Sequence, residues 1–379
     1  MDKKYLVITY GCQMNIHESE KLCGMLEELG FEKTDKKEDA DIIVFNTCCI
    51  RQGAEDRAFG NIGALKPLKK KNKNLIIAVC GCMTQQKDRV EKLEKVYPFV
   101  DIIFGTHNLH QFKDFVQKKL NGQKRVIEFC SDDRLMPEQT NIVRDDKTNA
   151  YVNIIYGCNN YCSYCIVPFV RGRERSRNFD EIIDEVKKLI GEGYKTITLL
   201  GQNVNSYGND IEDENVNFNN LLKTLALLDG DFEIKFMTSH PKDLSKDVVD
   251  TIASNKKLSK EIHLPVQSGS NKILELMNRK YTIEHYLEIV DYIKEKIPNV
   301  RLTTDLIVGF PGETEEDFNQ TIELVKKVKF DGIFAYMYSV RTGTKAEKME
   351  NQVPQEIKNE RVNKVLNLEK ELLKDKNPK

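Results

Sequence analysis

Several features that would define a particular class of protein are missing from this sequence of 379 residues. It contains no run of about 18 apolar residues, which excludes a predicted transmembrane helix. Its 58 basic and 59 acidic residues leave a formal net charge of -1, so overall charge does not indicate a nucleic-acid-binding protein. No low-complexity segment and no clear short repeat is present. A hydrophobic content of 40% and a charged content of 31% are typical of a soluble globular protein with two or three domains.

The amino terminus also lacks the pattern of a secretory signal, because its basic start precedes only a short apolar run that predicts a first strand. The expected compartment is therefore reducing, and the ten cysteines are not expected to form a disulfide framework. Ten thiols in a cytoplasmic chain indicate metal binding or redox chemistry. Positive charge gathers locally in 66–73, which we interpret as solvated surface, and in 171–177, which directly follows a cysteine-rich segment.

That cysteine-rich segment, GCNNYCSYC at 157–165, places Cys158, Cys162 and Cys165 in a C-x3-C-x2-C spacing. Three thiolates this close in sequence can turn to one point, whereas a closed zinc site or iron–sulfur cluster takes four ligands. The spacing therefore predicts a soft metal centre with one open position. A half zinc ribbon is an alternative that would need a second pair downstream, and no cysteine follows Cys165. Three buried cysteines without a ligand fit less well, because free cysteines are usually scattered through cores.

Residues 1–120 are predicted to form a doubly wound α/β domain, because strand-like and helix-like segments alternate. Three apolar runs predict parallel strands: 5–10, 40–47 and 74–82. Cys12, Cys48 and Cys82 each lie at the carboxyl end of one of these strands. Such ends meet at one edge of a parallel sheet, where α/β proteins build their sites. The pattern predicts a second metal centre, again with three ligands and an open position.

The other cysteines are not expected to be ligands. Cys49 and Cys80 neighbour expected ligands but point the opposite way along a strand, so we interpret them as packing residues. Cys23 lies on the apolar stripe of the first predicted helix and is interpreted as core. Cys130 has no predicted role.

Residues 121–143 are polar and mixed and are predicted to be a linker. Strands and helices then alternate again, and 144–375 contain about six predicted strands. Eight such units close a TIM barrel, so this domain is predicted to be a partial (β/α)6 TIM-like barrel with its site at the carboxyl ends of the strands. The cysteine segment follows the first of these strands. Near the last strands, GFPGET predicts a turn in which Thr314 caps the following helix.

The two cysteine sets and long stretches of sequence resemble the radical SAM methylthiotransferase family. The resemblance extends from TYGCQMNIHESE near the start to MYSVRTGT near the end. It implies that Cys158, Cys162 and Cys165 hold a 4Fe-4S cluster whose open iron binds S-adenosylmethionine. One-electron cleavage of that molecule would give a 5′-deoxyadenosyl radical.

The resemblance also implies a second, auxiliary 4Fe-4S cluster that supplies sulfur. Its ligands would be Cys12, Cys48 and Cys82, which match by the contexts YGCQMN, NTCCIR and GCMTQ. All six cysteines would thus be catalytic as well as metal-binding. An iron–sulfur electron-transfer protein is the non-enzymatic alternative, but such carriers normally close their clusters with four cysteines.

Within the family, three stretches are similar to the branch that methylthiolates carbon 2 of N6-dimethylallyladenosine next to the anticodon in tRNA, using two S-adenosylmethionine molecules. They are GCNNYCSYCIVPFVRGRERSR, HLPVQSGSNKILELMNRKYT and TTDLIVGFPGETEEDF. Branches that act on N6-threonylcarbamoyladenosine in tRNA or on a ribosomal-protein aspartate are alternatives. Family members usually continue into a small C-terminal β-barrel, the TRAM domain, which this sequence is expected to lack.

The resemblance further suggests contacts to S-adenosylmethionine. Tyr164 is expected to pack against its adenine, with core packing as the alternative. Other contacts are expected near the ends of the barrel strands, each with a structural role as the alternative: Gly201, Gln202, Asn203, Ser239, Gln267 and Asp305. His263 is interpreted as a core or rim residue, because no second histidine stands at metal-binding spacing to it.

The expected partners are a tRNA substrate and a reduced flavodoxin or ferredoxin-type electron donor, for a monomeric cytoplasmic enzyme with no membrane association. Four arginines after the cysteine segment are expected near the tRNA backbone or the cofactor, with solvated side chains as the alternative for at least two. These are Arg171, Arg173, Arg175 and Arg177.

Overall fold

The computed structural model describes residues 3–49, 52–129 and 141–376. By its internal contacts the chain divides into two compact units: Met1–Lys147 with Val167–Arg173, and Thr148–Ile166 with Glu174–Lys379. The chain therefore leaves the second unit after Ile166 and returns to it at Glu174. Cys130 and the central part of the predicted linker lie outside the described residues. No helix among the described residues combines the length and apolar character needed to cross a membrane.

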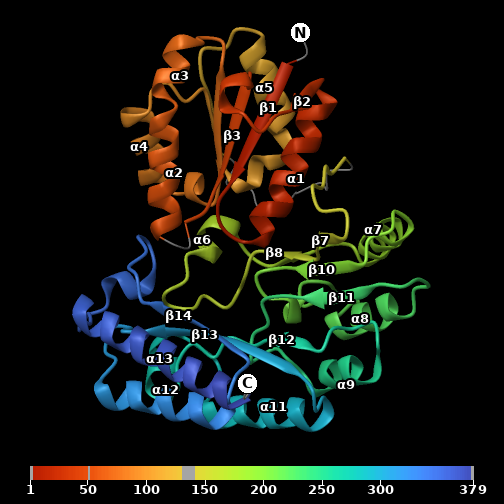
Figure 1. Ribbon diagram of the computed structural model, residues 1–379, viewed down its shortest axis with the longest axis vertical. Helices are drawn as coiled ribbons and strands as arrows, with labels where there is room; N and C mark the ends of the chain where they lie inside the picture. Colours follow the sequence, from red (N-terminus) through yellow and green to blue (C-terminus); the bar gives the residue numbers. More distant parts are fainter. Residues whose placement is uncertain (1–2, 50–51, 130–140, 377–379) are drawn as a thin grey trace. The chain divides into compact units, whose positions relative to one another are not determined.

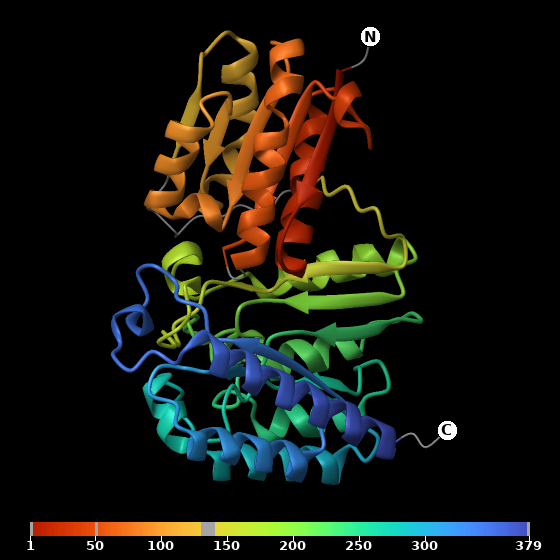
Figure 2. The ribbon, with the colours of Figure 1, turned by 60° about the vertical axis from the view of Figure 1, so that its left-hand side comes forward.

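The first unit is built on a parallel six-stranded sheet with the order β2-β1-β3-β4-β5-β6 (Figures 1 and 2). Its strands are β1 (Lys3–Thr9), β2 (Phe31–Lys33), β3 (Ile42–Thr47), β4 (Ile76–Gly81), β5 (Ile102–Phe104) and β6 (Val126–Glu128). The doubly wound parallel sheet predicted from the sequence is confirmed. Strand β6 lies within the residues predicted as a linker, yet it pairs with β5 and completes the sheet.

Helices cover both faces of this sheet, which is why β3 and β4 are buried along their whole length (Figure 1). On one face lie α1 (Gln13–Glu28) and α5 (Phe112–Leu120), and on the other α2 (Gln52–Ala64), α3 (Lys66–Lys71) and α4 (Lys87–Val96). Leu22 and Leu26 of α1 share one apolar cluster with Phe112 of α5 and with Val44 of β3. In the helical layer on the other face, α2 contacts α4, because Phe59 of α2 stacks on Tyr97 at the end of α4.

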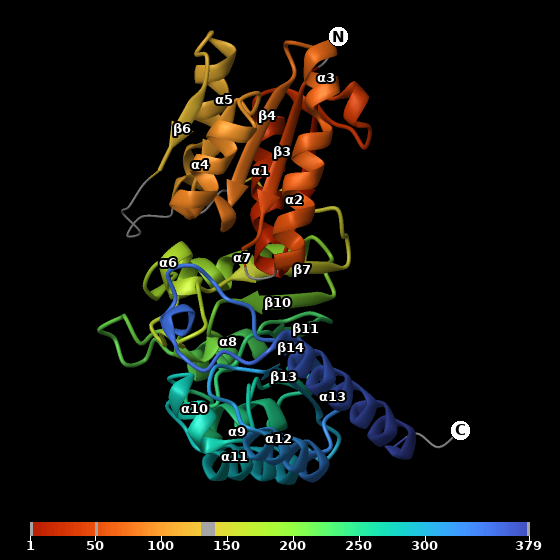
Figure 3. The same ribbon diagram turned by 90° about the vertical axis from the view of Figure 1, so that its left-hand side faces the viewer.

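The second unit contains six parallel strands among the described residues, arranged as two three-stranded sheets, β11-β10-β7 and β12-β13-β14 (Figures 1 and 3). They are β7 (Asn149–Asn153), β10 (Thr196–Leu200), β11 (Glu233–Phe236), β12 (Glu261–His263), β13 (Arg301–Val308) and β14 (Gly332–Met337). A single bridge, Ile234 to Leu258, leads from one sheet towards the other, and one apolar core spans both. The predicted partial barrel is confirmed.

Helices follow the strands of this barrel and form its outer layer (Figure 3). They are α7 (Phe179–Gly191), α8 (Phe218–Ala226), α9 (Lys246–Ser254), α10 (Asn271–Leu276), α11 (Ile283–Lys296), α12 (Glu315–Val328) and α13 (Gln355–Lys376). Buried Ile182, Val186 and Leu189 of α7 recur at helical spacing and face the core. A short antiparallel pair that the sequence did not predict, β8 (Ile155–Tyr156) with β9 (Arg175–Ser176), flanks the cysteine segment.

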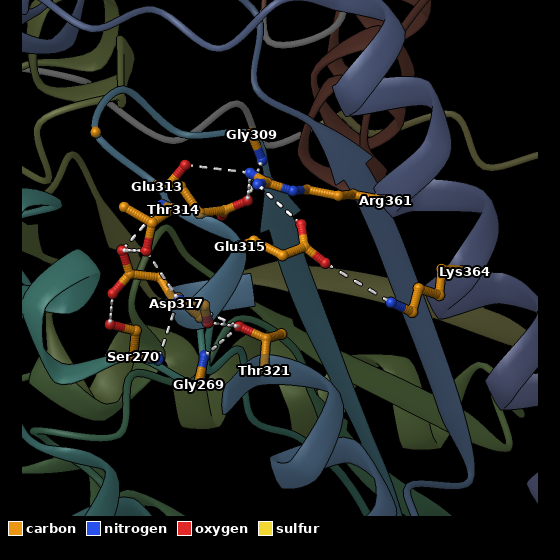
Figure 4. A network of polar contacts seen from close by, with 12 residues as sticks. Gly269, Ser270, Gly309, Glu313, Thr314, Glu315, Asp317, Thr321, Arg361 and Lys364 are labelled. Carbon is orange, nitrogen blue, oxygen red and sulfur yellow. Dashed lines mark hydrogen bonds and ion pairs between the residues drawn. The ribbon is translucent and has the colours of Figure 1, made fainter. Parts of the chain in front are cut away.

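The GFPGET turn after β13 ties several elements of this unit together, as Figure 4 shows. Thr314 caps α12 as predicted, in a reciprocal capping box with Asp317. Buried Glu313 accepts hydrogen bonds from the backbone of Gly309 at 2.9 Å and from Arg361 of α13 at 2.6 Å. Asp317 also accepts from the hydroxyl of Ser270 at 2.7 Å, which fixes the amino end of α10.

Candidate iron–sulfur sites and cofactor contacts

In the first unit, Cys12, Cys48 and Cys82 lie at the carboxyl edge of the sheet, after β1, β3 and β4. These are neighbouring strands, so their ends lie side by side. Two glycines with positive φ allow the loops to approach one another. A Cβ atom on Gly11 would lie 2.7 Å from the Cβ of Cys48, and one on Gly81 would lie 2.3 Å from the carbonyl oxygen of Thr47. The structure therefore brings the three predicted ligands to one edge.

Two buried asparagines hold these loops in place. Asn15 of α1 donates from Nδ2 to the carbonyl oxygens of Tyr10 at 2.8 Å and Thr47 at 3.1 Å, which joins the first loop to the second. Asn46 donates from its own Nδ2 to the carbonyl oxygen of Asn15 at 2.9 Å. The third loop is joined to the second by the backbone, because the Cys82 amide donates to the Thr47 carbonyl at 2.9 Å.

A buried arginine completes the surroundings of this cysteine set. Arg171 ends the short helix α6 (Val167–Arg171), which belongs to the first unit although it follows Cys165 in sequence. Its Nη1 donates to Oε1 of Glu18 at 2.6 Å, and its Nη2 donates to Oε2 of Glu18 at 3.1 Å and to Oδ1 of Asn15 at 2.9 Å. Arg171 and Glu18 are 5% and 2% exposed in their side chains. Arg171 is thus a buried, bidentate partner of a carboxylate.

The thiols of this set experience opposing influences. Burial raises the pKa of Cys12, against the attraction of the Arg171 charge. A hydrogen bond from the Cys49 thiol lowers the pKa of Cys82, and the charge of Arg171 lowers it further. The sequence interpretation of Cys49 as a packing residue missed this contact, because adjacency in sequence does not reveal it. Cys80 lies in the apolar cluster of the first unit, and Cys23 lies there too.

In the second unit, the segment that carries Cys158, Cys162 and Cys165 is fixed by the end of α10. The Ser163 amide donates to the carbonyl oxygen of Met277 at 2.9 Å, and Asn278 donates from Nδ2 to the carbonyl oxygen of Tyr161 at 2.9 Å. Burial raises the pKa of Cys158 to about 11, so near neutral pH this thiol would lose its proton only when its sulfur binds a metal.

A second buried arginine lies beside this segment. Arg279 donates from Nη1 to the sulfur of Cys162 at 3.4 Å, from Nη2 to the carbonyl oxygen of Pro265 at 3.0 Å, and from Nε to the hydroxyl of Tyr281 at 3.1 Å. Sequence reasoning missed Arg279, because it is separated from Cys162 by 117 residues. The donor chemistry suits a cluster, because the sulfur of one of the three candidate ligands, Cys162, lies next to a cation that is buried and fixed.

No three His, Cys, Asp or Glu side chains among the described residues gather tightly enough to hold a single metal ion. A four-iron cluster occupies more space than one ion and keeps its cysteines farther apart, so the cysteines of a cluster site do not need to gather this tightly.

Three of the predicted cofactor contacts carry buried polar atoms that have no hydrogen-bond partner among the described residues. They are Oδ1 of Asn203, Oγ of Ser239 and Oε1 of Gln267. They follow strands β10, β11 and β12, at the carboxyl end of the barrel. Buried polar atoms are normally paired, and leaving one unpaired costs free energy. A polar ligand in the barrel mouth would satisfy them.

The other predicted contacts have roles within the chain. Gln202 accepts from the Gly157 amide at 2.6 Å and so supports the cysteine segment. A Cβ atom on Gly201 would lie 2.4 Å from Cγ2 of Ile155, so this position needs a glycine. Tyr164 packs edge-on against Phe310, with ring centroids 6.4 Å apart. Oδ1 of Asp305, on β13, lies 3.5 Å from Nε2 of His263.

The four arginines predicted near tRNA or the cofactor do not behave alike. Arg171 is bound to Glu18, and Arg177 is buried and donates to Glu185 at 2.8 Å. Neither is free to reach a tRNA backbone, because each is committed to a carboxylate of its own unit. Arg173 is exposed and Arg175 is half-buried. The sequence could not distinguish buried from exposed arginines here, because all four recur at every second position of RGRERSR.

The fold, the three-cysteine segment and the polar barrel mouth are those of a radical SAM protein. A family model described as Radical SAM superfamily matches residues 152–325, and one described as Uncharacterized protein family UPF0004 matches residues 4–105. The radical SAM superfamily implies a 4Fe-4S cluster and S-adenosylmethionine.

Curated relatives define the family more closely. The chain is 53% identical over 374 residues to a tRNA-2-methylthio-N(6)-dimethylallyladenosine synthase of Clostridium botulinum (strain Okra / Type B1), covering 99% of this chain and 83% of the relative. It is 53% identical over 376 residues to a protein of the same description from Caldicellulosiruptor saccharolyticus, covering 99% and 80%. The chain therefore belongs to the radical SAM methylthiotransferases, which are transferase enzymes.

Two solved structures share the fold at low sequence identity. The radical S-adenosylmethionine methyltransferase TsrM from Kitasatospora setae aligns with a TM-score of 0.65 at 13% identity, covering 92% of this chain and 77% of that one. The cobalamin-dependent S-adenosylmethionine radical enzyme OxsB aligns with a TM-score of 0.60 at 13% identity, covering 98% and 56%. At this identity the likeness concerns the fold alone.

Proposed function

We propose that this protein methylthiolates carbon 2 of N6-dimethylallyladenosine next to the anticodon of tRNA, using two S-adenosylmethionine molecules and sulfur from an auxiliary cluster. The observation that carries the proposal is a pair of three-cysteine sets in a chain that is 53% identical over 374 residues to a synthase of that description. Each set lies beside a buried arginine, Arg171 in the first unit and Arg279 in the second.

Cys158, Cys162 and Cys165 would hold the 4Fe-4S cluster that, when bound, supplies one electron to S-adenosylmethionine. The chain's own part is to fix these ligands through the end of α10 and to place Arg279 against Cys162. The amino group of S-adenosylmethionine would donate to the unpaired oxygens of Asn203, Ser239 and Gln267. Three buried acceptors in one barrel mouth suit a cationic amino group.

Cys12, Cys48 and Cys82 would hold the auxiliary 4Fe-4S cluster, which supplies the sulfur of the methylthio group. Asn15 and Gly11 allow the loops of this set to lie together, and Arg171 provides a fixed positive charge beside them. Its relatives are described as tRNA-modifying synthases. The protein would likewise act on tRNA, and we expect it in the cytoplasm. A reduced flavodoxin or ferredoxin-type protein would supply electrons, and a monomer would suffice because each cysteine set is complete within one chain.

The test has two stages. The chain is first reconstituted anaerobically with iron and sulfide and incubated with dithionite and S-adenosylmethionine, and 5′-deoxyadenosine is measured. If no 5′-deoxyadenosine forms, the radical enzyme is rejected and an iron–sulfur electron-transfer protein is the remaining alternative. The chain is then expressed in a bacterial host that lacks its own enzyme, and tRNA nucleosides are quantified by mass spectrometry. A rise in 2-methylthio-N6-dimethylallyladenosine supports the proposal, whereas a rise in the threonylcarbamoyl counterpart, or in neither, redirects it to the alternative tRNA or ribosomal-protein substrate.

A further inference from the structure

The ion pair between Glu18 and Arg171 is among the most deeply buried of the described residues, with side chains 2% and 5% exposed. Arg171 also contacts Asn15, which joins the loops that carry Cys12 and Cys48. Both Nη atoms of Arg171 are bonded to the same carboxylate, at 2.6 and 3.1 Å. Burying two charges costs free energy that their attraction only partly returns, so such a pair is weak evidence of a role in stability. Its position next to candidate ligands points to an electrostatic role.

Both charges act on the sulfur atoms of this set. Oδ1 of Asn15 accepts from Nη2 of Arg171 at 2.9 Å and lies 3.9 Å from the sulfur of Cys12. The guanidinium and the Glu18 carboxylate bound to it therefore place charges of opposite sign close to this sulfur. The electrostatic potential at the sulfurs is therefore a difference between two fixed charges in a region shielded from water, where such effects are strong. Removing either charge alone would leave the other uncompensated.

The same pair also holds the ligand loops. Nη2 of Arg171 donates to Oδ1 of Asn15 at 2.9 Å, while Nδ2 of Asn15 donates to the carbonyl oxygens of Tyr10 and Thr47 at 2.8 and 3.1 Å. Arg171 thereby selects the orientation of the Asn15 amide, since the oxygen must face the guanidinium. That orientation turns the amide nitrogen towards the loops that carry Cys12 and Cys48.

We propose that Glu18 and Arg171 are positioning residues for the auxiliary cluster, which orient Asn15 and set the reduction potential of the cluster through two opposed charges. The proposal rests on the proposed function, in that Cys12, Cys48 and Cys82 must hold a cluster. Three thiolates give an oxidised 4Fe-4S cluster one net negative charge, and uptake of one electron adds a second. Arg171 favours that uptake and Glu18 opposes it, so the carboxylate keeps the sulfur-donating centre from being reduced as easily as Arg171 alone would allow.

The experiment uses the full chain with Cys158→Ala, Cys162→Ala and Cys165→Ala, so that only the auxiliary set can bind iron. Glu18→Gln, Arg171→Met, Arg171→Lys and the double variant Glu18→Gln/Arg171→Met are compared after anaerobic reconstitution. Iron and sulfide per chain are measured, and the midpoint potential is obtained by a dithionite titration followed by electron paramagnetic resonance. Lys69→Met is the control, because Lys69 pairs with Asp101 at 2.7 Å, at the opposite edge of the sheet.

The expected midpoint shifts are upward for Glu18→Gln, downward for Arg171→Met, and small for the double variant and for Lys69→Met. Loss of iron from Arg171→Met but not from Arg171→Lys would show that the site requires the positive charge. The effect of charge on the midpoint potential is then tested with Glu18→Gln alone. Equal shifts in the same direction, or no shift in Glu18→Gln, would overturn the proposal. Failure of the parent chain to bind iron at all would instead reject Cys12, Cys48 and Cys82 as cluster ligands.

Discussion

Arg279 donates a hydrogen bond from Nη1 to the sulfur of Cys162, across 117 residues of sequence, at 3.4 Å. Its remaining hydrogen bonds go to neutral acceptors, the carbonyl oxygen of Pro265 and the hydroxyl of Tyr281. The guanidinium is thus available to offset the negative charge that a thiolate-bound cluster brings. Partners of metal ligands of this kind are nearly as important as the ligands themselves.

We predict that Arg279→Met lowers 5′-deoxyadenosine formation by about 10- to 100-fold, because the cluster at Cys162 loses its buried cation and its orienting hydrogen bond. The rate is measured with dithionite as the reductant, and iron content is measured on the same sample. Arg301→Met serves as the control, since Arg301 makes an exposed ion pair with Glu261 at the other end of the barrel strands. Equal rates in the two variants would contradict the prediction.

Ser239→Ala is predicted to weaken binding of S-adenosylmethionine by roughly threefold to tenfold, which corresponds to the loss of one hydrogen bond. Its Oγ is buried and has no partner among the described residues, so the unliganded chain loses nothing on substitution. Ser245→Ala is the matched control, because that hydroxyl caps α9 and its loss costs about 1 kcal/mol of stability. Equilibrium binding and urea unfolding together distinguish the two effects. A destabilised Ser239→Ala with unchanged binding would assign this hydroxyl a structural role.

Gly11→Ala is predicted to lower the iron content of the auxiliary set severely. The new Cβ would lie 2.7 Å from that of Cys48, at a backbone φ of +115°. Gly30→Ala separates strain from crowding, because Gly30 also has a positive φ, of +81°, but nothing lies within 4 Å of a Cβ there. That control is expected to lose about 1 kcal/mol of stability and no iron. Iron is measured in chains with alanine at 158, 162 and 165, and similar iron in both variants would refute the crowding argument.

Glu20 makes the stability of the first unit depend on pH. Burial raises the pKa of Glu20 to about 7, in spite of the attraction of Arg144. In the unfolded chain the carboxyl ionises near pH 4. Between these values the folded state keeps a proton that the unfolded state has lost, so stability falls as the pH rises from about 4 to 7 and then levels off.

Glu20→Gln is therefore predicted to remove this pH dependence. Relative to the parent chain, the free energy of unfolding of the variant is expected to be higher at about pH 8 than at about pH 5, by on the order of 1–3 kcal/mol. Urea unfolding at the two pH values measures it. Glu91→Gln is the control, since Glu91 lies exposed on α4 and pairs only with Lys95 among the described residues. The prediction is wrong if Glu20→Gln unfolds with the same pH dependence as the parent chain.

Local sequence pattern was sufficient for the elements that bury long apolar runs. Strands β1, β3 and β4 and almost every helix of the barrel could be predicted, because period and capping residues such as Thr314 are local signals. The strands β2, β5 and β6 have three residues each, too few for a period to emerge. The six candidate ligands could be predicted because they lie at strand ends and in one compact motif.

What surrounds those ligands could not be predicted in the same way. Arg171 and Arg279 meet their partners only through the fold, because Arg171 is 153 positions from Glu18 and Arg279 is 117 positions from Cys162. Nothing in RGRERSR marks Arg171 as buried and Arg173 as exposed. Likewise, the contact of Cys49 with Cys82 depends on how two loops meet at the edge of the sheet.

The chain leaves the second unit after Ile166 and returns at Glu174, with Cys165 just before the first crossing and Arg171 between the two. Insertion or deletion of a single residue between these positions would shift a ligand of one centre or the guanidinium of the other. The same short segment therefore begins at a candidate ligand of one centre and contains the guanidinium beside the other.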